Sequence, residues 1–412
     1  MTKDLHDLHV LRREEWDRWY GRLELAFGGV PEAPQERRLW DDLTELDRSI
    51  GVWDGDECVG TAGAFSFRVS VPGGAFVDAA GVTMVSVAAT HRRRGILTSM
   101  MRRQLDDVRA WGEPLAVLTA SEPAIYGRFG YGIATRQLAL AIDSTKVRID
   151  APAGTDDVRL RIVDAAEAAE RCEAVHLRTV GTRPGMLARK PGWERLPLLD
   201  PEQDRGGASP LQCVVAERAG ETVGFARFHN KPESEFAVAH GRIQAREVTA
   251  LDPAAYAALW RFLCDIDLTE TVEARNRPVD DPLLSLVSDV RRCGVRVRDS
   301  MHVRLVEVGA ALEARTYLTP VDVVFDVEDS FCPWNEGRWR LVGDAKGASC
   351  KRTEEPADLA LSVRELGAAY LGDVSLTELA GAGRVRELRQ GALGEAAVAF
   401  GSPVAPWLQH GF

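Results

Sequence analysis

The residues most able to do chemistry in this chain lie in the segment THRRRGIL, residues 90–97. Three consecutive arginines supply positive charge, and the glycine after them removes the Cβ that would block close approach of a ligand to the backbone. The segment opens a predicted helix, whose first N–H groups lack partners and carry a partial positive charge. Such a turn after a buried strand can cradle a pyrophosphate. A basic helix cap explains the same letters, and the residues alone leave both interpretations open.

The spacing of this turn also excludes two common nucleotide sites. It is neither GxGxxG nor GxxxxGK[ST], so a dinucleotide-binding fold and a nucleoside-triphosphate loop are both disfavoured.

A second segment, SEPAIYGRFGYG (121–132), offers a candidate proton donor. Tyr126 lies in a predicted short helix between two glycine-rich bends, and a phenol can protonate a departing thiolate. Phe129 and Tyr131 are expected to be core aromatics. Glu122, close to Tyr126, is a possible general base, but a helix-capping acid is the favoured interpretation.

A strand, a helix and a second strand must position these two segments. Residues 83–87 are expected to form a buried strand, and residues 96–111 have the apolar spacing of an amphipathic helix. Gly112 and Pro114 end that helix, and residues 115–119 form another buried strand. Strand, basic turn, helix and strand together make a βαβ-type unit.

A weaker copy of this layout follows a linker near residues 152–156. The stretch VTALDPAAYAALWRFL (248–263) repeats the strand-then-helix order of VSVAATHRRRGILTSM (85–100), but it lacks the arginines and the glycine. Chance similarity and a duplicated domain that lost its ligand turn account for this equally well.

The remaining sequence predicts further mixed elements. Upstream, helical spacing covers residues 11–27 and 39–46, and strands are expected at 50–53, 58–67 and 69–71. Downstream of Met301, strands are expected at 302–306, 323–327 and 339–342, and helical segments at 356–370, 376–380 and 385–393. The last stretch, AFGSPVAPWLQHGF, is apolar, so it is expected to be docked rather than free.

Composition narrows the function class. The 412 residues are 45% hydrophobic and 27% charged, which are globular values. With 51 basic and 62 acidic side chains the formal charge is −11, which disfavours nucleic acid and anionic membranes as partners and favours cations. No apolar run is long enough to span a bilayer and no signal-peptide core is present, so a cytoplasmic protein is expected. The seven cysteines are scattered without metal-ligand spacing, so we expect free thiols and no metal.

Residues 83–132 resemble the GCN5-related N-acetyltransferase fold. The resemblance rests on the strand TMVSV, the R-x-x-G turn from Arg92 to Gly95, the strand LAVLT and the tyrosine segment that ends in glycine. The family's third small residue is Leu97 here. Across its full length the chain is similar to the Eis (enhanced intracellular survival) family.

That resemblance implies an α/β (α+β) architecture of three parts. An acetyltransferase domain is expected at residues 1–148, a degenerate acetyltransferase-like domain at 149–299, and a sterol-carrier-protein-like domain at 300–412. It also implies a homohexamer.

The resemblance further implies acetyl-CoA as donor and primary amines of cationic substrates as acceptors, including aminoglycosides, which would confer antibiotic resistance, and lysine side chains. Tyr126 would be the general acid and the terminal carboxylate of Phe412 the general base. Phe27 and Trp40 are candidate substrate-pocket walls, although single aromatics on helix faces are more often core residues. The residues expected to hold acetyl-CoA are Val85, Ser86, Val87, Arg92, Arg93, Arg94, Gly95, Ile96, Ser121 and Glu122.

Residues 32–57 hold nine acidic residues against three arginines. A solvated helical face explains most of them, but a part of this segment at the rim of a cleft would attract polycations.

A protein that binds a lipid or small molecule in its third region, with a vestigial first region, is the alternative function.

Overall fold

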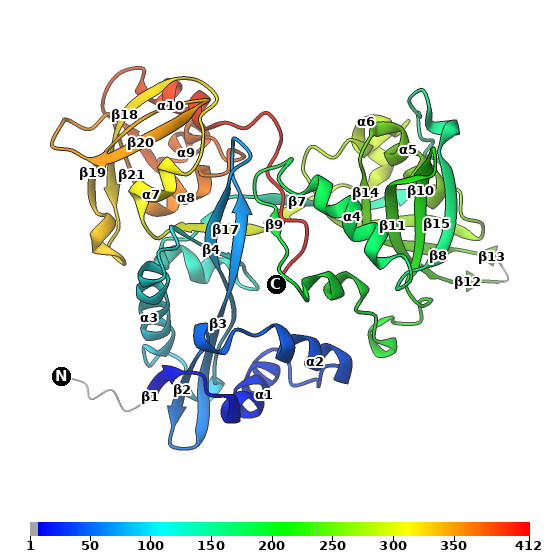
Figure 1. Ribbon diagram of the computed structural model, residues 1–412, viewed down its shortest axis with the longest axis horizontal. Helices are drawn as coiled ribbons and strands as arrows, with labels where there is room; N and C mark the ends of the chain where they lie inside the picture. The colour runs from blue at the N-terminus through cyan, green and yellow to red at the C-terminus, as the bar shows by residue number, and fades with distance from the viewer. Residues whose placement is uncertain (1–6, 237) are drawn as a thin grey trace. The chain divides into compact units, whose positions relative to one another are not determined.

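The computed structural model describes residues 7–236 and 238–412, which form two compact units (Figure 1). Unit 1 comprises the described part of Met1–Thr135 together with Arg183–Arg189 and Asp299–Phe412. Unit 2 comprises Arg136–Thr182 and Lys190–Arg298. The predicted site residues and both chain segments that carry them therefore belong to unit 1.

The first sheet of unit 1 has the order β1-β2-β3-β4-β5-β17-β6, with β9 paired to β3. All neighbours are antiparallel except β4 and β5, which run parallel. The strands are β1 Asp7–Val10, β2 Ile50–Asp54, β3 Glu57–Ser70, β4 Phe76–Val87, β5 Leu115–Thr119, β6 Gly132–Ile133, β9 Leu187–Ala188 and β17 Met301–Leu305.

Helices cover both faces of this sheet. Val52 and Trp53 are neighbours on β2 and so point to opposite faces. Val52 packs with Ile96 and Met100 of α3 (Ile96–Ala110), whereas Trp53 packs with the aromatic residues of α1 (Trp16–Ala26). The second N-terminal helix, α2 (Pro34–Leu43), buries Leu39 and Leu43. The predicted helix at residues 96–111 and the strand at 115–119 are confirmed almost to the residue.

A bulge in β4 shapes the region that precedes the basic turn. The register moves from Gly63↔Thr83 to Thr61↔Ser86, so β4 has one residue more than β3 in this interval. Met84 takes up the extra length with a φ of 53°. A bulge bends the strand that contains it and increases its twist, so the last residues of β4 can leave the plane of the sheet.

The C-terminal part of unit 1, residues 308–412, builds a second sheet of order β20-β19-β18-β21-β22. Its strands are β18 Val321–Glu328, β19 Gly337–Asp344, β20 Gly347–Arg352, β21 Leu359–Ser362 and β22 Val385–Glu387; its helices are α7 Val308–Glu313, α8 Val363–Ala369, α9 Leu376–Gly381 and α10 Ala392–Phe400. Two helical predictions are wrong here. The first part of 356–370 is β21, which pairs with β18, and the first part of 385–393 is β22, which pairs with β21. Pairing across the sheet overrides the local helical spacing.

The two sheets of unit 1 interlock through glycine. A Cβ on Gly132 of β6 would overlap Arg364 O and Ala368 N of α8, and a Cβ on Gly367 of α8 would overlap Val303 O of β17. The buried pair of Arg304 and Asp329, at 2.7 Å, joins β17 to the loop after β18. The C-terminal part is thereby fixed against the sheet that carries the tyrosine segment.

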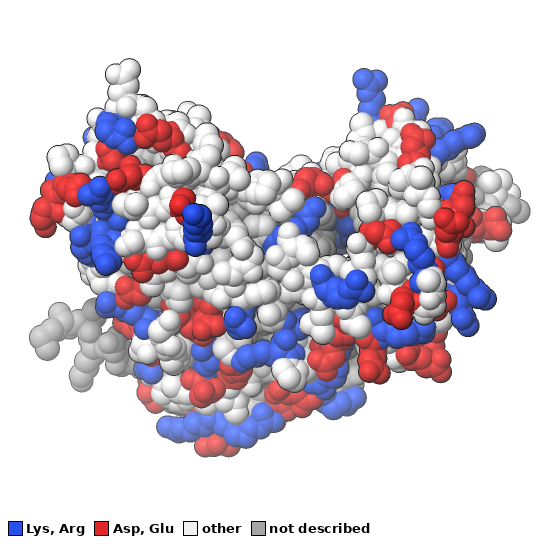
Figure 2. Space-filling view, turned by 45° about the horizontal axis from the view of Figure 1, so that its top comes forward, with Lys and Arg blue, Asp and Glu red and all other residues white. Residues whose placement is uncertain are grey.

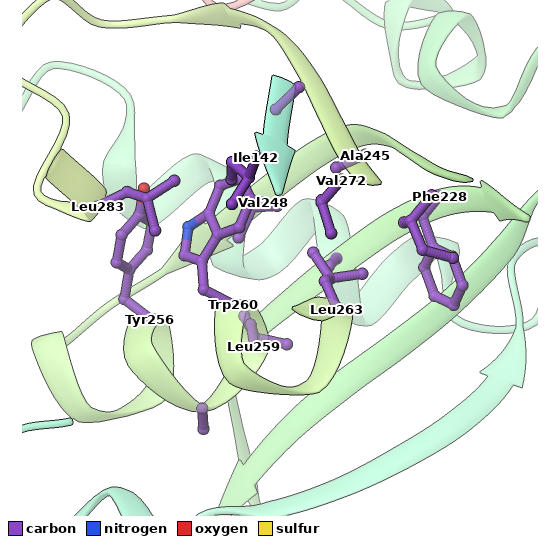
Figure 3. Close-up of a cluster of buried hydrophobic side chains, with 14 of the residues drawn as sticks. Ile142, Phe228, Ala245, Val248, Tyr256, Leu259, Trp260, Leu263, Val272 and Leu283 are labelled. Atoms are coloured by element: carbon purple, nitrogen blue, oxygen red, sulfur yellow. The ribbon is translucent and has the colours of Figure 1, made fainter. Parts of the chain in front are cut away.

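Unit 2 has a single larger sheet of order β16-β7-β15-β14-β11-β10-β8 and a small β12-β13 hairpin. In Figure 3, Trp260 and Leu263 of α5 point toward Val248 and Val272 of the sheet, in the centre of the buried cluster. Its elements are β7 Arg136–Asp143, β8 Arg159–Asp164, α4 Ala169–Thr179, β10 Gln212–Arg218, β11 Glu221–Lys231, β12 Ser234–Glu235, β13 Val238–Ala239, β14 Gly241–Ala250, α5 Pro253–Cys264, β15 Thr269–Arg277, α6 Leu283–Leu286 and β16 Arg296–Asp299.

Two strands pair with a sheet outside the expected domain range in which they lie. β7, inside the expected range 1–148, pairs with β15 of unit 2, and β17, inside 300–412, pairs with β5 of unit 1. Each of these strands buries side chains in the sheet it joins: Leu138, Leu140 and Ile142 of β7, and every residue of β17. A division of the sequence into three continuous ranges cannot show such an exchange.

The glycine interlock gives a test of the fold. We expect Gly132→Ala to lower the free energy of unfolding by at least about 2 kcal/mol, because the new Cβ meets backbone atoms that cannot move separately. Urea denaturation measures the change. Gly21→Ala in α1 is the matched control: its Cβ would meet no heavy atom within 4 Å, so it should be neutral or stabilising by about 0.5–1 kcal/mol. Equal stability of both variants would contradict the interlock.

Candidate active site

The basic turn joins β4 to α3, and its backbone enters the left-handed region twice. Arg93 has a φ of 64°, and Gly95, the N-cap residue of α3, has a φ of 85°. Within the described chain no side chain caps this helix start, and its first turn holds no acidic residue. The side chains of Arg92 and Arg94 are exposed, like that of Arg93. Three solvent-exposed cations therefore directly precede the uncapped helix N–H groups, as a site for a phosphate-bearing ligand requires.

Glycine is required at position 95 for its positive φ and for the open space that the missing Cβ leaves. A Cβ there would meet no heavy atom within 4 Å, so packing does not demand glycine. Its positive φ does, and the open space lets a ligand approach the backbone closely. Just before the turn, buried His91 lies 2.8 Å from Thr90 Oγ1 and 3.3 Å from Asp54 Oδ2, which fixes the turn to the end of β2.

β4 leaves β5 at Gly81. Parallel pairing joins Ala79–Gly81 to Leu115–Val117, whereas β4 itself continues to Val87. The N–H of Ala88 donates to Val59 O on β3 at 2.8 Å, so strand alternation directs the N–H of Val87 to the opposite side, where β5 has departed. An extended ligand with amide groups can pair along that edge.

Val85 and Ser86 line the same stretch of β4. The hydroxyl of Ser86 lies 2.7 Å from Thr61 Oγ1, a contact that holds the bulged strand to β3. Val85 packs against both apolar clusters beneath α3, and half-buried Leu97 contacts the same clusters. The turn, the bulge and the first turn of α3 are thus one packed assembly, which includes buried Ile96.

Tyr126 lies in the 3-10 helix Pro123–Phe129, next to the open end of β5. Its ring packs against the cluster that contains Ala80 and Val82 of β4, and its centroid is 6.0 Å from that of Tyr131. Burial, and after it the charge of Glu122, raise the pKa of Tyr126. The phenol therefore keeps its proton throughout the neutral range, as a proton donor must. The expected core positions of Phe129 and Tyr131 are confirmed, each being 1% exposed.

Ser121 and Glu122 form the exposed loop between β5 and Tyr126. The prediction that Glu122 caps the following helix is wrong, because its side chain makes no cap hydrogen bond although it occupies the N-cap position. Its negative charge contributes to the raised pKa of Tyr126.

Phe412 reaches β4 from the other face of the sheet. Its ring lies edge-on to Phe67, with centroids 5.0 Å apart, and a Cβ on Gly81 would lie 3.2 Å from its Cε2. Residues 80 and 82 contact the cluster under Tyr126, and residue 81 between them contacts Phe412. Both expected catalytic residues thus flank the same three residues of β4, at the level where β4 leaves β5. The expectation of a docked C-terminus is confirmed, with Leu408 only 2% exposed.

The two expected pocket walls differ. Trp40 on α2 is half-buried and stacks on Phe65, with ring centroids 6.4 Å apart, on the face of β3 that also carries Phe67. Phe27 follows the last residue of α1 and is 62% exposed, so its expected core position is wrong. Trp40, Phe65, Phe67 and Phe412 form a continuous aromatic row beside the open end of β4.

Three of the nine acids in segment 32–57 pair with arginines that lie outside it. Figure 2 shows acidic and basic side chains interspersed over the face in view. The partners are Asp41 with Arg13 at 2.6 Å, Glu57 with Arg22 at 2.6 Å and Asp56 with Arg18 at 3.9 Å. Attraction of a polycation by this segment therefore depends on less net charge than its count of acids suggests.

Among residues 7–236 and 238–412, no helix is both long and apolar enough to cross a bilayer. No three His, Cys, Asp or Glu side chains of these residues gather where they could hold a metal ion. The seven cysteines are free.

Comparison with known proteins agrees with this geometry. Residues 7–134 and 185–305 each match a family described as an acetyltransferase (GNAT) domain, and residues 308–409 match a sterol carrier protein domain. An uncharacterized N-acetyltransferase of Streptomyces avermitilis is 69% identical over 406 residues, which cover 98% of this chain and 99% of that protein. The N-acetyltransferase Eis of Mycobacterium tuberculosis is 32% identical over 406 residues, 94% of this chain and 96% of its own. The crystal structure of Eis1 from Mycobacterium abscessus has a TM-score of 0.83 at 34% identity, and the match covers 99% of this chain and 100% of that one.

The chain belongs to the Eis family of N-acetyltransferases. It has two GNAT-type domains and a C-terminal sterol-carrier-type domain, as predicted. It is an acetyltransferase, with acetyl-CoA as co-substrate and a second molecule as acceptor. The open edge of β4 and the uncapped start of α3 fit the extended, phosphate-bearing shape of that donor.

Sequence reasoning missed several residues that shape this Eis-type site. Gly81 and Phe67 hold the ring of Phe412, and the segment 183–189, far away in sequence, pairs with β3 through β9. The apolar C-terminus is the one sequence signal for this packing, because apolar residues at a chain end are expected to be buried against the protein. Nothing in residues 183–189 marks them as part of unit 1.

The role of Gly95 can be separated from simple strain. We expect Gly95→Ala to weaken acetyl-CoA binding about tenfold or more, since the methyl group enters the space in front of the helix N–H groups. Isothermal titration calorimetry measures the dissociation constant. Gly112→Ala, at the other end of α3, is the matched control, because Gly112 also has a positive φ of 77° and no heavy atom within 4 Å of its Cβ position. Both variants should lose similar stability, about 1 kcal/mol. Equal losses of acetyl-CoA affinity in the two variants would contradict a direct role of the Gly95 backbone in binding.

Proposed function

We propose that this protein transfers an acetyl group from acetyl-CoA directly to a primary amine of a cationic substrate. Tyr126 would be the general acid and the terminal carboxylate of Phe412 the general base. The observation that carries the proposal is the meeting of both residues at Ala80–Val82 of β4, Tyr126 through the cluster on one face and Phe412 through Gly81. Aminoglycosides and lysine side chains are the acceptor classes, and a cytoplasmic homohexamer is the expected form.

The proton inventory supports these roles. Acetyl-CoA supplies a thioester, whose C–S bond breaks as the new N–C bond forms. An alkylammonium has a pKa of about 10.4 and must lose a proton before it can attack, whereas a terminal carboxylate, with a pKa of about 3.3–3.7, is ionised at neutral pH and can accept it. The Tyr126 hydroxyl, kept protonated by burial, supplies a proton to the departing thiolate.

The aromatic row beside the carboxylate favours a cationic acceptor. Half-buried Trp40 can present a π face, which attracts cations, whereas Phe65 and Phe67 next to it in the row are buried. The row lies on the face of the sheet that Phe412 contacts. The cofactor-binding roles that we assign to Val85, Ser86, Val87, Arg92, Arg93, Arg94, Gly95, Ile96, Ser121 and Glu122 follow from their places on the open edge of β4, in the turn and in the loop before Tyr126.

Lipid binding by the C-terminal part has less support. The space between its sheet and helices is filled by buried side chains, among them Phe325, Tyr370 and Phe400. A surface hollow of about 770 Å³ lies between the ends of β18, β19 and β20, but Asp322, Asp344 and Lys346 line it together with small and apolar residues. Charged walls suit a lipid chain poorly.

The acid role predicts a specific loss. We expect Tyr126→Phe to lower kcat about 100-fold while the dissociation constant of acetyl-CoA changes less than about twofold, because only the transferable proton is removed. Thiol release with kanamycin as acceptor measures the rate. Tyr131→Phe is the matched control, since the Tyr131 hydroxyl has no hydrogen-bond partner within the described chain. Full activity of Tyr126→Phe would remove Tyr126 from the mechanism.

The base role predicts that the last residue must keep its carboxylate. A single glycine appended after Phe412 converts that carboxylate to an amide and moves the charge along the chain. We expect kcat at pH 7 to fall about 100-fold with acetyl-CoA affinity retained. The deficit should shrink as the pH approaches the pKa of the acceptor amine, because the amine then needs no base. An extended protein with unchanged kcat would show that the proton leaves by another route.

A further inference from the structure

The last residues of the chain are held by a segment from the middle of the sequence. After α10 ends at Phe400, residues 401–412 form no helix or strand. Their backbone is tied instead to residues 183–189: Arg183 Nη1 donates to Ala405 O at 2.9 Å, and Trp407 N donates to Pro184 O at 2.8 Å. An irregular tail without such ties would fray in solution.

Gln409 makes the tie that lies nearest to the end of the chain. Its Oε1 accepts from Leu187 N at 3.0 Å, and its Nε2 donates to Leu187 O at 2.7 Å. The side-chain amide thus satisfies both polar groups of one residue, as a neighbouring strand would. Only a primary amide of this length offers the donor and the acceptor together, since a carboxylate cannot donate.

Leu187 is a firm anchor because it is itself bound to the sheet. In β9 it pairs with Val69 of β3. Next to it, Ser70 binds the segment with its backbone and its side chain: its O accepts from Gly185 N at 2.7 Å, and its Oγ accepts from Met186 N at 2.9 Å and donates to Arg183 O at 2.6 Å. Gln409 is therefore linked to β3 through Leu187 and its neighbour Met186.

The two hydrogen bonds between the Gln409 amide and Leu187, called the clamp below, limit where the terminal carboxylate can lie. Gln409 and Phe412 are separated by three residue steps, which span at most about 10 Å. The ring of Phe412 is the second fixed point, 5.0 Å from Phe67 on β3. Between the two anchors stands exposed Gly411, the residue with the greatest backbone freedom. The ring contact alone leaves the carboxylate free to rotate about the last bonds, and the clamp shortens the range of that motion.

We propose that Gln409 is a positioning residue for acetyl transfer, which acts through its amide pairing with Leu187 to hold the terminal carboxylate beside β4. This inference rests on the proposed role of that carboxylate as general base. It assigns to residues 183–189 a part in the reaction, although no atom of theirs needs to touch a substrate.

The other titratable groups of the tail do not obscure a test by pH. Burial and the nearby charge of Arg189 lower the pKa of His410 to about 4. His410 therefore stays neutral between about pH 6 and pH 10, where the acceptor amine changes its protonation.

The test compares Gln409→Glu and Gln409→Ala with wild type. Glutamate keeps the size of the side chain but loses the donor to Leu187 O, and alanine removes both hydrogen bonds. We expect kcat with kanamycin at pH 7 to fall about tenfold to 100-fold in both, as for a catalytic group displaced by about 1 Å. The acetyl-CoA dissociation constant should stay within about twofold, and the deficit in kcat should shrink toward pH 10, because a deprotonated amine needs no base.

Controls separate the possible failures. Gln203→Glu and Gln203→Ala make the same changes at an exposed position of unit 2 and should leave kcat unchanged. In the protein with an appended glycine, the Gln409 changes should add little, since the carboxylate is already displaced. An inert appended glycine would overturn the proposed base itself, whereas a damaging glycine with active Gln409 variants would overturn only the clamp. A deficit in kcat that is constant with pH, or loss of folding in both Gln409 variants, would also overturn the positioning role of Gln409.

Discussion

The departure of β4 from β5 at Gly81 is the constraint on which the rest of the site depends. Two adjacent strands normally satisfy each other's backbone groups, and an unpaired stretch inside a sheet is costly unless another partner takes those groups. The bulge at Met84 opens this stretch, and Ser86 holds the bulged strand to β3. An extended ligand with amides could complete the sheet there, and the helix start at Gly95 would then face the anionic end of the same ligand.

In the proposed mechanism, the same opening gives a role to residues from three distant parts of the sequence. Tyr126 approaches Ala80–Val82 from the α3 face, and the C-terminus approaches from the opposite face. In that mechanism a proton leaves the amine and another proton reaches the thiolate, so an acid on one face and a base on the other would serve the two reactants separately. A chain end suits this task because it brings a charge without a further side chain. An internal residue is held by the chain on both sides, whereas a terminal residue is held on one side and needs additional contacts.

The part of the site that is local in sequence could be predicted, and the part that depends on distant pairing could not. The helical spacing of residues 96–111 and the run at 115–119 gave nearly correct bounds, since each pattern is contained in its own element. Residues 356–370 gave a helix where β21 begins, because its pairing with β18 involves a partner more than 30 residues away. Phe27 has the same helical spacing as its neighbours, but it lies beyond the end of α1 and is exposed. The pairing of Leu187 with β3 and Gln409 has no local signal at all.

Unit 2 shows how the same layout loses a ligand. Its strand β14 leads into α5 as β4 leads into α3, but the N-cap of α5 is Asp252, whose carboxylate accepts from Ala255 N at 2.9 Å. Arg218 pairs with the same carboxylate at 2.9 Å, so the charges that an anion would need are already satisfied within the protein. At α3 the equivalent position is Gly95, with no side chain to cap the helix and three arginines before it. A self-capped helix gains about 1 kcal/mol of stability, and an uncapped one keeps its N–H groups for a ligand. The two domains therefore differ in what can complete the helix start: an internal carboxylate at α5, and in our proposal an external phosphate at α3.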